Sequence, residues 1–415
     1  MKKVIFFLTV LFFTLSAQAQ VWVAQKSWNS AWQDRYAQWI ASKVGPQFFK
    51  ELGGEYAKLK MDCADAHYAL KVYFSYQNGL DFAVSGGKIT NATTRFNHLS
   101  GDKKITAFIN FLSSSLGTES LAHQDTYPIA VRDVAPGDLF MYKVGTNGNF
   151  TRHTYIVKNI NVDGTFDVLY STQDRMHKGL PLNRHKSYMF TKAPLNGGVD
   201  KNHWGFRRAK LPSFASVAQE SLNFADFSQY SLAQKLGQIG FFREVRRIHQ
   251  TVTESPNMMT KRNFDTICNE VKDRVSIVTN AVKFVRGVGG RCLNYQEYDT
   301  YSTPSRDSGI RDNYRNFELD YTSIVQKNQS AKVDATLFKN ASVIFAKGQL
   351  SSSQTQQVYK ACPVKTGAGD VNLANFKQGL FAGKVSFHPN DNESLRWGLS
   401  NSARTRCTEF YGYPN

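Results

Sequence analysis

After its first fifteen residues, the 415-residue chain lacks any apolar run long enough to cross a bilayer, so no transmembrane anchor is expected there. It also lacks an internal repeat and a low-complexity tract, which argues against a solenoid or an extended disordered protein. No pair of histidines or cysteines has zinc-ligand spacing, so neither a metal site nor a cofactor is expected. No recognised nucleic-acid-binding module is present, and specific nucleic-acid binding is not expected.

The N-terminus has the three parts of a secretory signal. Lys2 and Lys3 precede an apolar stretch over residues 4–15, and Ala17-Gln18-Ala19 follows it as an A-x-A cleavage site. The sequence therefore predicts a signal peptide over residues 1–19 and a mature chain that begins at Gln20. We expect an exported protein, periplasmic or secreted.

Acidic residues are few relative to basic ones. The chain has 33 Asp and Glu against 51 Lys and Arg, a formal charge of +18, with about +9 between residues 20 and 212 and about +7 after them. Such an excess favours anionic partners such as wall polymers, acidic lipid head groups or nucleic acid. The alternative is that the charge serves only solubility.

Cysteines are scarce, and their distribution is uneven. Four of the five, Cys268, Cys292, Cys362 and Cys407, lie in the second half of the chain. In an oxidising compartment these are expected to form disulfides. The simplest pairing joins neighbours in sequence, Cys268 with Cys292 and Cys362 with Cys407, but the other two pairings remain open. Cys63 is then a single thiol, either buried and inert or reactive.

The pattern of apolar residues predicts an α+β protein of two domains. Helical spacing covers 61–76 and 105–116, and short strands separated by turns follow at 139–144, 153–160 and 166–170. After Leu211-Pro212 the pattern is mostly helical, over 230–253, 263–288 and 303–329. We therefore expect domains at 20–212 and 213–415, the second being a helical, disulfide-tied accessory domain. Helices followed by an antiparallel meander are typical of the α+β class.

The surroundings of Cys63 in sequence favour a reactive thiol. Asp62 is a good N-cap residue, and Asp65 three positions later completes a capping-box pattern, so Cys63 lies in the first turn of a helix. The positive end of a helix lowers a thiol pKa, and its N–H groups can stabilise an oxyanion. A general base is then needed, and His153, which opens a strand directly after a Gly/Asn turn, is the best-placed histidine. His67, one turn after Cys63, is expected to be a surface or packing residue.

Three sequence blocks resemble the NlpC-type and CHAP-type cysteine peptidases, which are papain-like domains. They are D-C-A-D at 62–65, P-G-D-L at 136–139 and H-T-Y-I-V at 153–157, with Thr154 in place of the usual valine, and the resemblance covers roughly residues 55–175. It implies Cys63 as nucleophile and His153 as general base. It also implies a bacterial cell-wall peptide or glycopeptide as substrate.

The third catalytic position in this family is a polar residue on the next strand that orients the histidine. The residue at this position is often His, Asn, Gln or Glu. In this sequence the position falls near Tyr170 or Ser171, neither of which is the usual choice, with Gln173 as a further substitute. Alternation along a strand points Tyr170 and Ser171 to opposite faces, so only one can reach His153. The alignment favours Tyr170.

The sequence therefore predicts an exported cysteine amidase or endopeptidase acting on peptidoglycan peptides or a related amide. One alternative is a transglutaminase-like acyl transferase, in which Asp167 is the candidate third residue. The other is a catalytically inactive hydrolase-like protein that binds the anionic envelope.

Two further groups of residues admit a functional and a structural interpretation. An arginine stripe, Arg243, Arg246 and Arg247, either contacts phosphates or forms a solvated helix face. Four N-terminal tryptophans either line a binding groove or cover the core; they are Trp22, Trp28, Trp32 and Trp39.

Overall fold

A computed structural model describes residues 20–146, 149–172, 175–179, 202–410 and 412. The predicted signal peptide and Gln173 lie outside these residues. Within the described ranges, no helix has both the length and the apolar character needed to span a membrane.

The first elements are helices, as expected. They are α1 (Ser30–Lys43), α2 (Phe48–Leu52), α3 (Cys63–Asn78) and α4 (Gly101–Ser115), followed by two short turns of helix, α5 (Thr118–Ser120) and η2 (Leu121–Asp125). Helix α3 begins at a complete capping box, because Asp62 accepts from the backbone of Asp65 while Asp65 accepts from the backbone of Asp62. It ends at Gly79, whose φ of 65° is the left-handed conformation that glycine adopts without strain. The prediction of a helix over 61–76 is confirmed.

A six-stranded antiparallel sheet follows. Its strands are β3 (Thr126–Pro128), β4 (Leu139–Thr146), β5 (Asn149–Ile160), β6 (Phe166–Thr172), β7 (Arg175–Gly179) and β8 (Gly205–Ala209). Their order in space is β3-β8-β4-β5-β6-β7. Strands β4, β5 and β6 agree with the three predicted strands, whereas β7 and the insertion of β8 between β3 and β4 were not predicted. The combination of helices with an antiparallel sheet confirms the α+β class.

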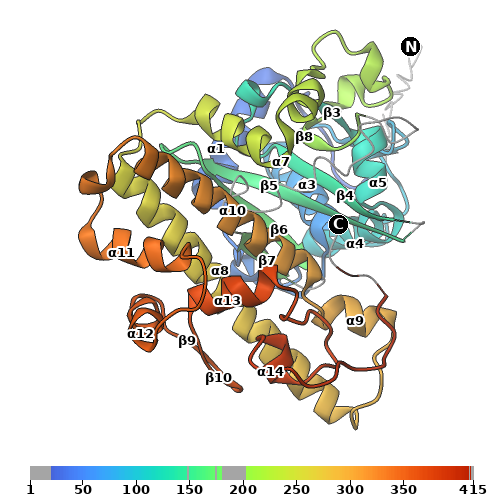
Figure 1. The fold of residues 1–415 in the computed structure, drawn as a ribbon. Helices are drawn as coiled ribbons and strands as arrows, with labels where there is room; N and C mark the ends of the chain where they lie inside the picture. Colours follow the sequence, from blue (N-terminus) through green and yellow to red (C-terminus); the bar gives the residue numbers. More distant parts are fainter. Residues whose placement is uncertain (1–19, 147–148, 173–174, 180–201, 411, 413–415) are drawn as a thin grey trace, which may run out of the picture.

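Both faces of the sheet are buried. One face carries Met141 and Ile156 and packs against the N-terminal helices, mainly α3. The other face carries Tyr155 and Phe206 and packs against α7 (Ser228–His249), which contributes Phe242 among others. Figure 1 shows the sheet with α3 and α4 drawn in blue and cyan and α7 in yellow-green.

Helix α7 lies beyond the expected domain boundary at residue 212, yet it shares a core with the sheet. Residues 222–245 share a core with the sheet, while the next separate core begins at Phe264. The division between cores therefore falls between α7 and α8 (Pro256–Gly287). The reason is physical: a sheet with two apolar faces needs a second covering layer, and α7 supplies it.

The second core is mostly helical, as predicted. Around α8 lie α9 (Tyr295–Tyr301), α10 (Pro304–Gln326), α11 (Ala335–Ile344), α12 (Ser352–Ala361), α13 (Leu373–Phe381) and α14 (Glu393–Arg396), with a small hairpin of β9 (Val364–Thr366) and β10 (Gly369–Val371). These elements, coloured olive to red, form a group of their own in Figure 1. Helix α8 begins earlier than predicted, because Ser255 caps it and Pro256 occupies its first position.

All four C-terminal cysteines are paired, but not with their neighbours in sequence. The disulfides are Cys268–Cys362 and Cys292–Cys407, and they close segments separated by 94 and 115 residues. The first joins α8 to the end of α12, and the second joins the loop after α8 to the C-terminal tail. The simplest pairing was wrong because helix packing, not sequence distance, brings these sulfurs together.

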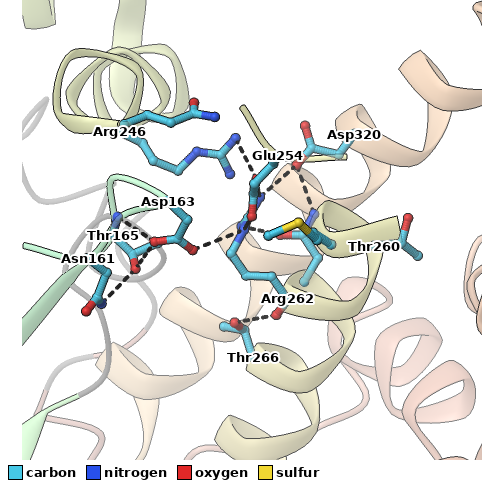
Figure 2. Close-up of polar contacts among 12 residues, drawn as sticks. Asn161, Asp163, Thr165, Arg246, Glu254, Thr260, Arg262, Thr266 and Asp320 are labelled. Atoms are coloured by element: carbon cyan, nitrogen blue, oxygen red, sulfur yellow. Dashed lines mark hydrogen bonds and ion pairs between the residues drawn. The ribbon is translucent and has the colours of Figure 1, made fainter. Parts of the chain in front are cut away.

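A charged joint connects the sheet to the second core (Figure 2). Arg262 at the start of α8 donates twice to Glu254, at 2.6 and 2.9 Å, and lies 3.9 Å from Asp163 in the turn between β5 and β6. On the α7 side, Arg246 lies 3.2 Å from Glu254. The same turn is so close to α7 that a Cβ added at Gly164 would lie 2.0 Å from the carbonyl oxygen of Arg246.

The arginine stripe of α7 is part of internal ion pairs. Arg243 pairs with Asp320 at 2.7 Å, Arg246 with Glu254, and Arg247 with Glu244 at 2.7 Å. Carboxylates of the same chain thus neutralise the stripe that suggested phosphate contacts.

The N-terminal tryptophans cover the core. Trp22 and Trp28 are buried, and each donates its indole N–H within the chain, to Leu80 and Ser75 respectively. Trp32 and Trp39 pack on the same core from its edge. The covering interpretation, rather than the groove, describes them.

Candidate functional site around Cys63

Cys63 occupies the first turn of α3, as the sequence predicts, with its side chain directed into the protein. Its side chain is only 6% exposed, and its sulfur lies 3.6 Å from the hydroxyl of Thr118. The backbone N–H groups of Ala64 and Thr154 also hydrogen-bond to the sulfur. Because the other four cysteines are paired, Cys63 is the free thiol of the chain.

The electrostatics of this thiol differ from the expectation. Burial, followed by the nearby charge of Asp62, raises the pKa of Cys63 from 9.0 to about 11. The hydrogen bonds from Thr118, Thr154 and Ala64 favour the thiolate but do not offset burial. A helix N-terminus lowers a thiol pKa when the sulfur is also solvated, and this sulfur is not.

His153 lies on β5, opposite Tyr142 of β4. Its ring packs among three tyrosines, with centroids 4.8 Å from Tyr155, 5.6 Å from Tyr170 and 5.7 Å from Tyr142. Tyr155 and Tyr142 belong to the core on the α7 side of the sheet. The imidazole is therefore on the face that α7 covers.

Cys63 lies against the other face. Thr154, the residue after His153, is fully buried, and its backbone contacts the Cys63 sulfur. Successive side chains of a strand point to opposite faces, so the Thr154 side chain is on the α3 side and that of His153 is not. The structure does not bring the Cys63 thiol and the His153 imidazole together.

The candidates for the third position divide in the same way. Tyr170 is on the His153 side, in ring contact with it, as the alignment predicts. Ser171 is on the Cys63 side, where its hydroxyl donates to the backbone oxygen of Met61 at 2.8 Å. Asp167 pairs with Asn159, six residues along β5 from His153, so the acyl-transferase arrangement does not form either. Asp62 acts as the helix cap and faces solvent.

His67 is a packing residue, which agrees with the expectation. It is 2% exposed, and burial lowers its pKa to about 3, with the charge of Lys71 adding to the effect. Lys71 is itself buried with its ammonium 3.5 Å from the centre of the Trp28 ring, and burial lowers its pKa to about 7. His67 and Lys71 both belong to α3 and are buried in the interior of the protein.

Sequence reasoning missed a charged cluster next to Thr118. Glu119 contacts Lys143 of β4, Arg152 of β5 and His123 of η2. The sequence does contain a signal for this cluster, because two basic residues, Lys143 and Arg152, lie in the neighbouring strands and become cross-strand partners. Finding it required the β4–β5 register, which the turn sequence alone did not fix.

The fold and the site define an α+β protein with an antiparallel sheet covered on both faces and a buried free thiol beneath one of them. No protein-family model, no curated protein and no solved structure matches the chain.

Proposed function

We infer that the chain is an exported, hydrolase-like protein without catalytic activity that binds anionic polymers of the bacterial cell envelope. The observation that carries this proposal is the placement of Cys63 and His153 on opposite faces of one sheet. A thiol–imidazole pair needs the two side chains within hydrogen-bond reach, and here a layer of backbone separates them.

The state of the thiol supports the same proposal. A nucleophilic cysteine requires an accessible thiolate, whereas Cys63 is buried and its pKa is raised to about 11. Thr154, which faces Cys63, has no titratable group. On this proposal, the resemblance to papain-like peptidases is limited to the sequence blocks and does not extend to a working dyad.

The charge of the chain supports the envelope as partner. The formal charge is +18, and neutralisation of the arginine stripe of α7 leaves many other basic residues at the surface. Exposed examples on α8 are Lys272, Lys283 and Arg286. Spacings of eleven and three residues place these three side chains on one side of the helix. A cationic surface attracts anionic polymers through a field that salt screens.

The test combines binding and hydrolysis on the same material. Mature protein is incubated with purified cell-wall sacculi carrying their anionic polymers, and bound protein and released peptides are measured at increasing salt. We expect salt-sensitive binding, no peptide release, and unchanged binding for Cys63→Ala and His153→Ala. Peptide release by the wild type that Cys63→Ala abolishes would refute the proposal, whatever the effect of His153→Ala.

A cysteine hydrolase is the second candidate, and one observation favours it. The backbone N–H groups of Ala64 and Thr154 converge on the Cys63 sulfur, at the end of a helix where an oxyanion could be stabilised. In this alternative, Cys63 attacks an amide carbonyl. The thiol proton is taken by a base other than His153, because His153 lies on the opposite face of the sheet. Peptide release that Cys63→Ala abolishes and His153→Ala leaves intact would identify it.

A further inference from the structure

Two cationic side chains stand directly opposite each other on the central strands. Lys143 of β4 and Arg152 of β5 are cross-strand partners, two residues along from the Met141–Thr154 pair. They therefore share the face that α3 covers and on which Cys63 lies. Like charges in this position destabilise a sheet unless something compensates them.

Glu119 provides part of that compensation. One of its carboxylate oxygens lies 3.3 Å from the Lys143 ammonium and also accepts from the Arg152 guanidinium, while the other lies 3.2 Å from the ring of His123. Glu119 follows Thr118, the residue that contacts the Cys63 sulfur. The cluster is thus adjacent to the thiol.

A second imidazole completes one wall of the cluster. The rings of His123 and His203 stack with centroids 4.1 Å apart, and Trp204 lies edge-on to His123. Behind His203, the side chain of Gln219 lies 3.3 Å from its Nε2 atom. The fully buried Arg207 holds Gln219 in turn, through a 2.7 Å hydrogen bond.

These groups differ in exposure in a way that suits a ligand. The Lys143 side chain is 8% exposed and rigidly placed in the sheet, whereas Arg152, Glu119 and His123 are 33, 40 and 32% exposed. Together the two cations and the carboxylate carry one net positive charge, and the two imidazoles add N–H donors. A guanidinium presents paired donors that match the oxygens of a carboxylate or phosphate.

We propose that Glu119, His123, Lys143, Arg152 and His203 form a binding site for an oxyanion, a carboxylate or phosphate group of an envelope polymer. Glu119 occupies the cations when no ligand is bound and competes with it. This inference rests on the proposed envelope binding and gives it a location. Carboxylates occur in wall peptides and phosphates in wall polymers and lipid head groups, so the chemistry of the site is shared by these sources.

The test measures calorimetric binding of inorganic phosphate and of acetate to the mature protein at low salt. Two substitutions are expected to act in opposite directions. Arg152→Gln should weaken binding at least tenfold, because it removes the paired donors. Glu119→Gln should tighten it severalfold, because the competing charge is lost while the shape is kept. The matched control is Arg247→Gln on α7, an exposed arginine that also pairs with a glutamate, Glu244, and that should leave binding unchanged.

Tighter binding of phosphate than of acetate would assign the site to phosphate-bearing polymers, and the reverse to peptide carboxylates. Failure of the wild type to bind either anion, or equal binding by wild type and Arg152→Gln, would overturn the site. If Glu119→Gln does not bind the anion more tightly than the wild type, the site is also overturned, because Glu119 then does not compete with the anion for Lys143 and Arg152. If sacculus binding persists while the wild type binds neither anion, the proposed function stands and its location falls.

Discussion

The buried thiol allows a direct prediction of chemical reactivity. A shift of the Cys63 pKa from 9.0 to about 11 lowers the thiolate fraction at neutral pH about 100-fold relative to an unperturbed cysteine, because each unit is a factor of ten. Alkylation by iodoacetate proceeds through the thiolate, so we expect the native protein to react at least 100-fold more slowly than the denatured chain. Burial of the sulfur slows the reaction further.

Mass spectrometry of the alkylated protein across pH 6–10 measures this rate, and the four disulfide-bonded cysteines give no background. His153→Ala is the informative comparison. Since its ring lies on the other face of the sheet, its removal should leave the rate within about twofold of the wild type. Fast native alkylation at pH 7 that His153→Ala abolishes would show that our placement of the two side chains is wrong.

Three further predictions concern stability. Gly164→Ala should lower the free energy of unfolding, measured by thermal denaturation, by more than about 3 kcal/mol, because the new methyl group meets the Arg246 carbonyl. Gly290→Ala, with φ +73° and no atom within 4 Å, should lower it only by the ~1–2 kcal/mol of a left-handed residue. Equal losses would contradict the close contact between Gly164 and Arg246. Reduction of both disulfides should destabilise the α8–α14 unit by about 4–5 kcal/mol per bond on the chain-entropy estimate, measured by hydrogen exchange before and after dithiothreitol, and unchanged protection would count against it. Burial lowers the pKa of His67 to about 3 in the folded protein, whereas the unfolded chain takes up a proton near 6.5, so stability should be lost as the pH falls from about 6.5 to about 3. His67→Gln should reduce this pH-dependent loss of stability by a few kcal/mol. Identical stability–pH profiles for the two proteins in urea titrations would refute this.

The local elements were predictable because local signals encode them. The capping box at Asp62 and Asp65 fixed the start of α3, and turns rich in glycine and asparagine separated the strands of the meander. The face occupied by His153 was not predictable. After Thr154 its strand continues with Tyr155, Ile156 and Val157, which all belong to apolar cores because both faces of the sheet are buried. Without polar–apolar alternation, a sequence does not state which face a residue takes.

The packing of α7 on the sheet and the disulfide pairing were not predictable for a related reason. Both depend on contacts between segments far apart in sequence, such as α7 with the sheet or Cys268 of α8 with Cys362 of α12. Leu211-Pro212 is a local break in secondary structure, and such a break does not by itself locate a break between cores. The break between cores comes only after α7 has covered the sheet.

The strand order β3-β8-β4 has a consequence for the way this chain acquires its structure as it emerges from a ribosome or a membrane pore. The first half cannot close its sheet by itself, since an inner strand at Gly205–Ala209 and a covering helix at Ser228–His249 are still to come. Until then, Phe140 and its neighbours present an uncovered apolar surface and β3 has no neighbour in the sheet. Folding of the first half is therefore delayed, because about 250 residues must emerge before α7 can cover the apolar face of the sheet and so reduce the risk of aggregation. A holding chaperone would be most valuable to this protein during that interval.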